Sequence, residues 1–413
     1  MIKVADVSIA YQNLCITELH LPAMFKYSYI YAIVFLDLIS ISLIIPVWGT
    51  HLRSLGASHF HIALLGSTYS FLQFLSGTPI GALSDHYGRK IVLIVTICIC
   101  AVAYFLLGCV KSLIFIVLIR VIQGCLKHSQ LLCKTLVNDQ VPTDQQTTVY
   151  GRMNGFSSLS FVIGPIIGGH LMEKSEGFYS LACYTSLIFL FNALVVYFTV
   201  PNTTVLKKER KSSSPFNDLI EVNWNECWPA FSLKMLGAAA LFAYFSSVGL
   251  AMNEKFNLSP SEAGYTGALQ GLTGGITGFA AGKIENIIFP SKNPFTKCFY
   301  SFIMLGLGFV SLALAPNLTI FMASMIPISA SSTLIRGFNN EILYEQSSSD
   351  HKGLVAGAGA SSAAIARFLA PIICGFTMDT FGNNSGFLLS ALFSFTGAVL
   401  SICLTKRSKA HVE

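Results

Sequence analysis

The chain has 413 residues, of which 53% are hydrophobic and only 11% are charged, and its net charge is +6. A soluble domain usually has about 25% charged residues, so this composition excludes a protein whose whole surface faces water. The basic residues are dispersed at the ends of apolar runs, and we expect no nucleic-acid partner. The 11 cysteines do not have the spacing of a zinc site, and we expect neither a metal ion nor a cofactor.

The long apolar runs predict membrane-spanning helices. A helix needs about 20 mostly apolar residues to cross the hydrocarbon core, where its backbone must be hydrogen-bonded within the segment. Glycine, proline and charged residues divide the apolar sequence into twelve such segments, which predicts an all-α integral membrane protein in the lipid bilayer. The predicted spans are 29–50, 60–82, 91–110, 112–136, 147–171, 178–200, 230–252, 262–281, 296–315, 318–343, 353–376 and 385–404.

One long polar segment lies near the middle of the chain and separates two sets of six spans. It includes the basic run Lys207-Lys208-Glu209-Arg210-Lys211. We predict an N-terminal segment without a cleaved signal peptide at residues 1–28 and a first six-helix bundle at 29–200. A linker at 201–229, a second six-helix bundle at 230–404 and a short tail at 405–413 follow.

The distribution of Lys and Arg predicts the orientation in the membrane. If the N-terminus is cytoplasmic, the connections on the other side hold only 4 of the 26 basic residues, namely Arg53, Lys111, Lys174 and Lys255. Basic residues concentrate in cytoplasmic connections, so the N-terminus, the linker and the C-terminus are all predicted to be cytoplasmic. The sequence does not distinguish the plasma membrane from an organelle membrane.

The two sets of spans contain an internal repeat at an offset of 206 residues. This offset aligns Gly169 with Gly375 and Glu173 with Asp379. It also aligns the run Pro165-Ile166-Ile167 with Pro371-Ile372-Ile373. Because the offset is half the chain length, we predict two pseudo-symmetric halves in parallel orientation, with a substrate site where they meet.

The run Gly81-Ala82-Leu83-Ser84-Asp85-His86-Tyr87-Gly88-Arg89-Lys90 lies between the second and third spans. Gly81 and Gly88 are expected to allow a tight turn, and Asp85 to interact with a neighbouring helix end. Arg89 and Lys90 are expected to anchor the cytoplasmic side. An ordinary cytoplasmic turn is the alternative interpretation.

This run resembles the signature loop of the major facilitator superfamily, with His86 in place of the usual basic residue. The resemblance implies the major facilitator fold, with 12 transmembrane helices in two six-helix pseudo-symmetric bundles. It also implies a gating role for Asp85 and Arg89, through a contact with the other half that holds the outward-open state.

Further runs resemble the drug–proton antiporter branch of that family, which includes the tetracycline transporters. They are Leu36-Asp37 followed by Pro46, Arg120-Val121-Ile122-Gln123-Gly124, Gly164-Pro165-Ile166-Ile167-Gly168-Gly169 and Ala366-Arg367-Phe368-Leu369-Ala370-Pro371. Ser160 stands where the antiporter motif usually has glycine, so close helix packing is less certain there. The resemblance implies proton-coupled antiport in the direction of export, and it places Arg367 in the substrate cavity.

Charged residues inside the spans are the candidate functional groups. Asp37 is flanked by apolar residues, and an aspartate within a span is normally functional, although a helix-end aspartate touching water is the alternative. Arg120 and Lys127 are seven residues apart and share one helix face with Gln123 and Gln130. At 1.5 Å per residue, Asp37 lies at a depth between the two cations. We expect Asp37 to bind the coupling proton, with Arg120 as its main partner and Lys127 as a second cation.

These residues lead to a functional expectation. We expect a monomeric secondary active transporter of a small organic solute, coupled to protons and working by alternating access. Gln123, Lys127, Gln130 and Arg367 are expected to line the substrate cavity. Lys127 and His128 favour an anionic or zwitterionic solute, unless Lys127 only neutralises Asp37. A facilitated-diffusion carrier and a non-transporting receptor or sensor remain alternatives, whereas an enzyme is not expected, because the sequence has neither a phosphate loop nor an HExxH motif.

Overall fold

The computed structural model describes residues 27–174, 177–201, 224–289, 293–345 and 352–410, and within these ranges the chain is helical with no strand. Parts of all five predicted regions lie outside the described residues. These parts are residues 1–26 of the N-terminal segment, 202–223 of the linker, 411–413 of the tail, 175–176 of the first bundle, and 290–292 and 346–351 of the second.

The first half contains six spans, and two of these are broken into two helices each. The first break follows Ser42, and Pro46 then occupies the first turn of the next helix, where its missing N–H leaves no hydrogen bond unmade. The helices are α3 (Ser28–Ser42), α4 (Ile45–Ser54), α5 (His59–Tyr87), α6 (Arg89–Cys109), α7 (Leu113–Leu126), α8 (Ser129–Gln140), α9 (Thr143–Met172) and α10 (Gly177–Thr199).

The second half contains six spans, each formed by a single helix. They are α12 (Trp224–Phe256), α13 (Pro260–Ile288), α14 (Pro294–Leu314), α15 (Leu318–Glu345), α16 (Lys352–Phe381) and α17 (Asn384–Ala410). Each of the twelve predicted spans therefore has its counterpart, and the predicted helical membrane fold is confirmed. Among the described residues, ten spans are long and apolar enough to cross a membrane, and the other two are α5 and α13.

The helices extend beyond the apolar stretches that predicted them. α5 continues to Tyr87, past its predicted end at residue 82, and α12 begins at Trp224, inside the range expected to be linker. Hydropathy marks only the residues that suit hydrocarbon, whereas backbone hydrogen bonding continues the helix into the interfacial region. The predicted boundaries were therefore too short at these ends.

α5 and α13 begin with the same local structure. Ser58 Oγ accepts a hydrogen bond from the backbone N–H of His61, and Ser259 Oγ accepts one from that of Glu262, both at 3.3 Å. Each serine is the N-cap of a capping box, which satisfies backbone donors that a helix start leaves free. These equivalent starts support the pseudo-symmetry of the halves.

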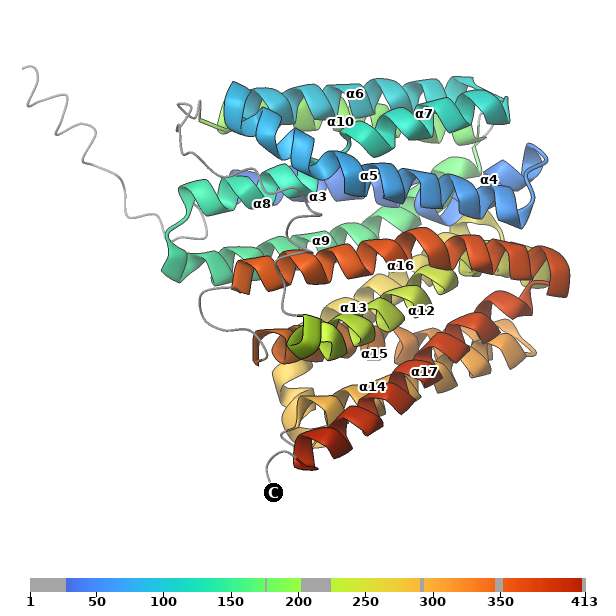
Figure 1. The fold of residues 1–413 in the computed structure, drawn as a ribbon. Helices are drawn as coiled ribbons and strands as arrows, with labels where there is room; N and C mark the ends of the chain where they lie inside the picture. The colour runs from blue at the N-terminus through green and yellow to red at the C-terminus, as the bar shows by residue number, and fades with distance from the viewer. Residues whose placement is uncertain (1–26, 175–176, 202–223, 290–292, 346–351, 411–413) are drawn as a thin grey trace, which may run out of the picture.

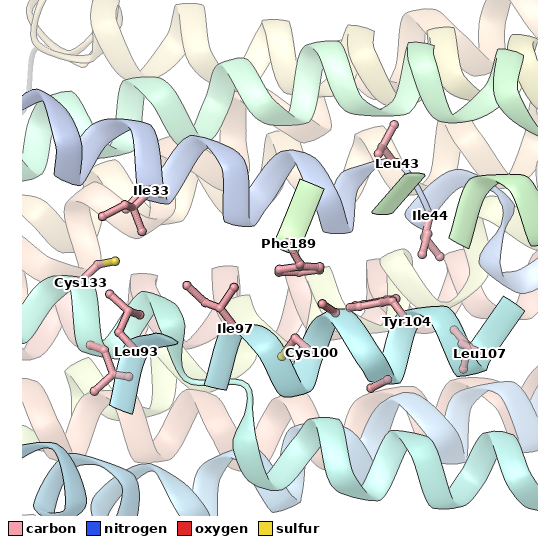
Figure 2. Close-up of a cluster of buried hydrophobic side chains, with 14 of the residues drawn as sticks. Ile33, Leu43, Ile44, Leu93, Ile97, Cys100, Tyr104, Leu107, Cys133 and Phe189 are labelled. Carbon is pink, nitrogen blue, oxygen red and sulfur yellow. The ribbon is translucent and has the colours of Figure 1, made fainter. Parts of the chain in front are cut away.

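The core of the first half lies where α3, α6, α8 and α10 meet. Figure 2 shows Ile33 of α3 and Leu43, which directly follows α3, facing Ile97, Cys100 and other side chains from α6, with Phe189 of α10 between α3 and α6. All five residues are buried except for a few per cent of their surface at most. A membrane protein gains little from the hydrophobic effect between helices, so this close packing supplies much of the association.

The two halves meet along two pairs of helices. α9 of the first half packs along α13 of the second, and α16 of the second half packs along α5 of the first. In Figure 1 the first half lies above the second, and α9 and α16 run across the middle. We call the end of the molecule that holds residues 55–58, 257–259 and 382–383 the distal end. On the predicted topology it faces away from the cytoplasm.

Candidate functional site

The fourth span is interrupted at Lys127 and His128, which join α7 to α8. A helix that stops inside a membrane leaves carbonyl oxygens without partners, and these must be satisfied by neighbouring helices. Gln73 of α5 supplies one such partner, since its Nε2 donates to the carbonyl oxygen of Lys127 at 2.9 Å. Ser76 supplies another, since its Oγ lies 3.3 Å from the carbonyl oxygen of Gly124 and also 2.8 Å from Nε2 of the His128 ring. The break is therefore stabilised by α5.

The interruption directs the side chain of Lys127 to Asp37 on α3. Lys127 Nζ lies 2.9 Å from Asp37 Oδ1, and the two residues are 5% and 0% exposed. Ser129 Oγ donates to the same carboxylate oxygen at 2.6 Å, and Gln130 Nε2 donates to Oδ2 at 3.0 Å. The Asp37 carboxylate thus accepts three hydrogen bonds from the α7–α8 junction. An ionised pair can persist at such a buried position when its remaining valences are also satisfied.

The expectation that Arg120 is the main partner of Asp37 needs correction. The guanidinium carbon of Arg120 lies 3.8 Å from the ring centroid of Trp48, and its NH1 donates to Gln123 Oε1 at 3.1 Å. The seven-residue spacing places Arg120 and Lys127 on one face only if the helix is continuous. Because the chain breaks at Lys127, this side chain reaches Asp37 while Arg120 does not.

The structure divides the four residues expected in the substrate cavity into two groups. Lys127 and Gln130 bind Asp37 and belong to the ion-pair cluster. Gln123 is buried beside Arg120, and Arg367 of α16 lies with its guanidinium carbon 4.9 Å from the ring centroid of Phe242. The second group comes from both halves of the molecule.

The signature loop forms its contacts within the first half. Arg89 forms an ion pair with Asp85 and a second one with Asp139 of α8, at 2.8 Å from Nε to Oδ2. Lys90 Nζ lies 5.3 Å from the ring centroid of Tyr197 on α10. Within the described part of the chain, Asp85 has no ion pair with the second half. The expected contact of Asp85 with that half therefore remains a prediction for the other state.

The two glycines of this loop do not share one role. Gly88 alone connects α5 to α6, and its φ of 94° lies in the region that favours glycine. Gly81 is inside α5, and no neighbouring atom lies within 4 Å of where its Cβ would be. The expectation that both glycines form the turn is therefore wrong for Gly81, because α5 continues past it.

The run Gly164-Pro165-Ile166-Ile167-Gly168-Gly169 of α9 packs against two other elements. A Cβ on Gly164 or Gly168 would collide with Ser42 or Leu43, at the break that follows α3, and a Cβ on Gly169 would collide with the backbone of Pro260 in the second half. Glycine permits such a close approach of backbones. The motif thus holds α9 against the broken first span and against the start of α13.

Polar contacts between the halves gather at the distal end. His59, which is 6% exposed, lies between two carboxylates of the second half, with Nδ1 2.8 Å from Asp379 Oδ1 and Nε2 3.2 Å from Glu254 Oε2. Arg53 Nε also binds Glu254, at 3.1 Å. Asp379 further accepts the backbone N–H groups of His59 and Phe60 at the start of α5.

A symmetric contact links the other pair of interface helices. Glu173, at the end of α9, accepts the backbone N–H of Ser261 at the start of α13, at 3.1 Å from Oε1 to N. Glu173 and Asp379 are the residues that the 206-residue offset aligns. Carboxylates are favoured at helix N-termini by the free N–H groups and the helix dipole. The repeat was therefore a signal for this pair of contacts, but only the structure shows that both acids bind the opposite half.

Comparisons with known proteins agree with this architecture. The chain matches the Major Facilitator Superfamily over residues 30–371, and a second match covers residues 230–413. The quinolone resistance protein NorA of Staphylococcus aureus strain MRSA252 is 24% identical over 360 residues, covering 85% of this chain and 89% of NorA. An uncharacterized MFS-type transporter of Methanocaldococcus jannaschii is 19% identical over 381 residues, covering 90% and 96%.

Solved structures have the same fold. A bacterial homolog of the human lysosomal transporter Spinster, in an inward-facing and unoccupied conformation, superposes with a TM-score of 0.80 at 14% identity, covering 92% of this chain and 96% of that one. The human organic anion transporter MFSD10 superposes with a TM-score of 0.68 at 18% identity, covering 92% and 100%.

Two six-helix halves that pack against each other, with a buried ion pair inside the first half, define a multi-pass membrane protein of the secondary-transporter class. The sequence match extends over most of the chain and identifies the family within that class. The chain belongs to the major facilitator superfamily, and its relatives place it with the drug-transporter-like branch. It is therefore a secondary transporter of a small solute.

Proposed function

We propose that this protein couples transport of a small organic solute to protons by alternating access, with antiport in the direction of export as the favoured mode. The observation that carries the proposal is the ion pair between Asp37 and Lys127, which is buried at the break between α7 and α8. Charged side chains inside a membrane are costly to bury and occur mainly in ion or proton pathways. Asp37 is the group in this cluster that can accept a proton and become neutral.

The geometry supports a coupling step at the helix break. A proton on Asp37 removes the negative charge that holds the Lys127 ammonium group, and an unpaired buried ammonium is strongly disfavoured. Lys127 would then move towards water or towards another anion. Ser129 and Gln130 also bind Asp37, so the whole α7–α8 junction is tied to the protonation state of one carboxylate.

Alternating access requires that the two ends of the molecule are never open at the same time. The distal contacts of Glu254, Asp379 and Glu173 join the two halves and would have to break before the distal end opens. In the state with an open distal end, we assign Asp85 the role of joining the halves at the cytoplasmic side. Arg89 would then lose its ion pair with Asp85 and keep the one with Asp139.

The direction of transport is supported by resemblance. NorA, a relative found over most of the chain, is named for quinolone resistance, which is consistent with removal of a compound from the cell. The Gly164–Gly169 run is the part of α9 that resembles the antiporter motif. Its glycines pack against the first span, close in sequence to Asp37, and would transmit a movement of α9 to that span.

The test is transport by the purified protein in lipid vesicles. A pH gradient is imposed, and a panel of organic anions, cations and zwitterions is screened for movement with and without the gradient. The proposal predicts gradient-driven accumulation of at least one solute. It also predicts that Asp37→Asn abolishes accumulation but keeps solute exchange, because exchange does not require net proton movement.

Two other outcomes would replace the proposal. Equilibration of a solute without accumulation, in wild type and Asp37→Asn alike, would identify a facilitated-diffusion carrier. Accumulation that persists in Asp37→Asn would place proton binding elsewhere, with Glu341 as the next candidate. Arg336→Gln is a matched control, since it removes a charge from α15 that forms no ion pair within the described residues.

A further inference from the structure

Two buried hydrogen-bond donors without acceptors, one from each half, lie apart from the ion-pair cluster. Gln123 is only 1% exposed, and its Nε2 has no partner among the described residues. Because Arg120 donates to Oε1 of the same amide, the unpaired atom must be the nitrogen. Arg367 Nε is also buried without a partner within the described chain. Nearly all buried polar groups in proteins are paired, so water or a bound solute is expected to supply the acceptor for these two donors.

The donors come from opposite halves and converge near Tyr69 of α5. Arg120 lies on α7, with its guanidinium carbon 6.0 Å from the ring centroid of Tyr69. Arg367 lies on α16, directly before Phe368 in the chain. An aromatic contact between Phe71 and Phe368, with centroids 4.9 Å apart, joins α5 to α16 at the same level. The two arginines therefore flank one region between the halves.

This region carries positive charge that protein carboxylates do not neutralise. Among the described residues, neither Arg120 nor Arg367 forms an ion pair with an acidic residue. The nearby buried carboxylate, Asp37, already binds Lys127, Ser129 and Gln130. In this conformation the carboxylate of Asp37 is therefore already hydrogen-bonded. Among the described residues, Arg120, Gln123 and Arg367 thus have no free carboxylate beside them that could bind a cationic solute.

Aromatic rings surround the donors. Arg120 stacks on Trp48, and Arg367 lies over Phe242. Phe71 and Phe368 form a further aromatic contact, between α5 and α16, next in the chain to Arg367. Guanidinium groups held on aromatic faces keep their in-plane N–H groups directed outward, where they can bind a planar carboxylate. The adjoining rings offer apolar surface to the rest of such a ligand.

We propose that Arg120, Gln123 and Arg367 form the substrate site, and that the substrate is an organic anion whose carboxylate is joined to a flat apolar body. This inference rests on the proposed transport function and adds the chemical class of its solute. The carboxylate accepts hydrogen bonds from the guanidinium groups and from Gln123 Nε2, and the apolar body packs on the aromatic rings. Lys127 is not part of this site, because Asp37 neutralises it.

Equilibrium binding to the purified full-length protein tests the proposal. The probes are 2-naphthoate and 2-naphthylmethylammonium, which share one ring system and carry opposite charges. Wild type is expected to bind the naphthoate at least tenfold more tightly than the ammonium compound. Arg367→Gln should weaken naphthoate binding by about tenfold or more, because hydrogen bonds to charged groups contribute that much. Arg367→Lys should recover part of the affinity, and it also serves as a variant expected to fold.

Arg336→Gln is the matched control. It removes the same type of side chain from the same half, from a guanidinium group that binds Thr333 Oγ1 instead of facing an unpaired site. The proposal predicts an unchanged naphthoate preference in this variant. An equal loss in Arg336→Gln and Arg367→Gln would assign the preference to the general positive charge and overturn the proposed site. Equal affinity for the two probes in wild type, or tighter binding of the ammonium compound, would overturn the solute class.

The binding test is independent of proton coupling. Asp37→Asn should bind naphthoate at least as tightly as wild type, because it frees the positive charge of Lys127. If wild type prefers naphthoate but Asp37→Asn still accumulates solute in a pH gradient, the coupling proposal fails and the solute class stands. If Asp37→Asn loses accumulation but wild type shows no anion preference, the coupling proposal stands and the solute class fails.

Discussion

Separate and combined removal of the charges of Asp37 and Lys127 provides a quantitative test of the buried pair. The Asp37 carboxylate is fully buried and accepts three hydrogen bonds, and Lys127 is almost fully buried 2.9 Å away. Removing one partner of a buried pair costs about 3–5 kcal/mol, because the other charge remains without compensation. We therefore expect Asp37→Asn and Lys127→Met each to lower the free energy of unfolding by about that amount.

The double variant should behave differently from the sum of the single variants. With both charges removed no buried charge is left unpaired, and replacement of a buried pair by neutral groups is often close to neutral in stability. At about 2–4 °C per kcal/mol, the single variants should lower the melting temperature in lipid nanodiscs by roughly 6–20 °C, and the double variant should recover most of it. Intrinsic fluorescence during a temperature ramp measures these shifts.

The pair between Lys297 and Glu341 offers an internal comparison. Lys297 Nζ lies 3.0 Å from Glu341 Oε1, but the glutamate side chain is 34% exposed, and Lys297 has a second partner in Glu285. Pairs with solvent-exposed partners contribute about 0–1 kcal/mol, so the same set of variants should show little recovery there. If the Asp37→Asn and Lys127→Met losses simply add in the double variant, the two side chains are not an interacting buried pair.

Three further predictions concern the gates and the close helix contact. Glu254→Gln should increase labelling of a cysteine placed at the distal end about tenfold, because it weakens the ion pairs that join the halves, and unchanged labelling would exclude a gating role. Hydrogen bonds from Ser261 lower the pKa of Glu173 below its usual range, so its contribution to distal closure is present at neutral pH and is lost as the pH falls through that lowered value. The difference in labelling between wild type and Glu173→Gln should therefore disappear in acid, and a difference that grows in acid would contradict this assignment. Asp85→Asn should shift labelling towards the state with a closed distal end, whereas Gly168→Val should reduce the amount of folded protein recovered in detergent, with normal recovery contradicting the close contact of α9 with Leu43.

Much of the fold could be predicted from the sequence, because membrane helices are determined by local composition. Twelve apolar segments, the basic residues at their ends and the 206-residue repeat were enough to predict two six-helix halves. Helix ends were less predictable, as α12 shows, because a helix continues outside the hydrocarbon region that hydropathy reports.

The candidate site was less accessible to sequence analysis because it depends on a broken helix. Residues 127 and 128 are lysine and histidine, and neither glycine nor proline indicates a break there. Seven-residue spacing consequently favoured Arg120 as the partner of Asp37, whereas the break gives that position to Lys127. The distal contacts of His59, Glu254 and Asp379 depend on residues brought together from distant parts of the chain, which periodicity does not report.

The most direct test of the central claim is a measurement of proton movement driven by solute. Vesicles that contain the protein and a trapped pH-sensitive dye are given a solute gradient at equal pH on both sides, using a solute identified in the vesicle screen. Our account predicts that solute flow through wild type changes the internal pH and that Asp37→Asn carries solute by exchange without this change. Solute flow through wild type with no proton movement, or equal proton movement in wild type and Asp37→Asn, would contradict coupling at the Asp37–Lys127 pair.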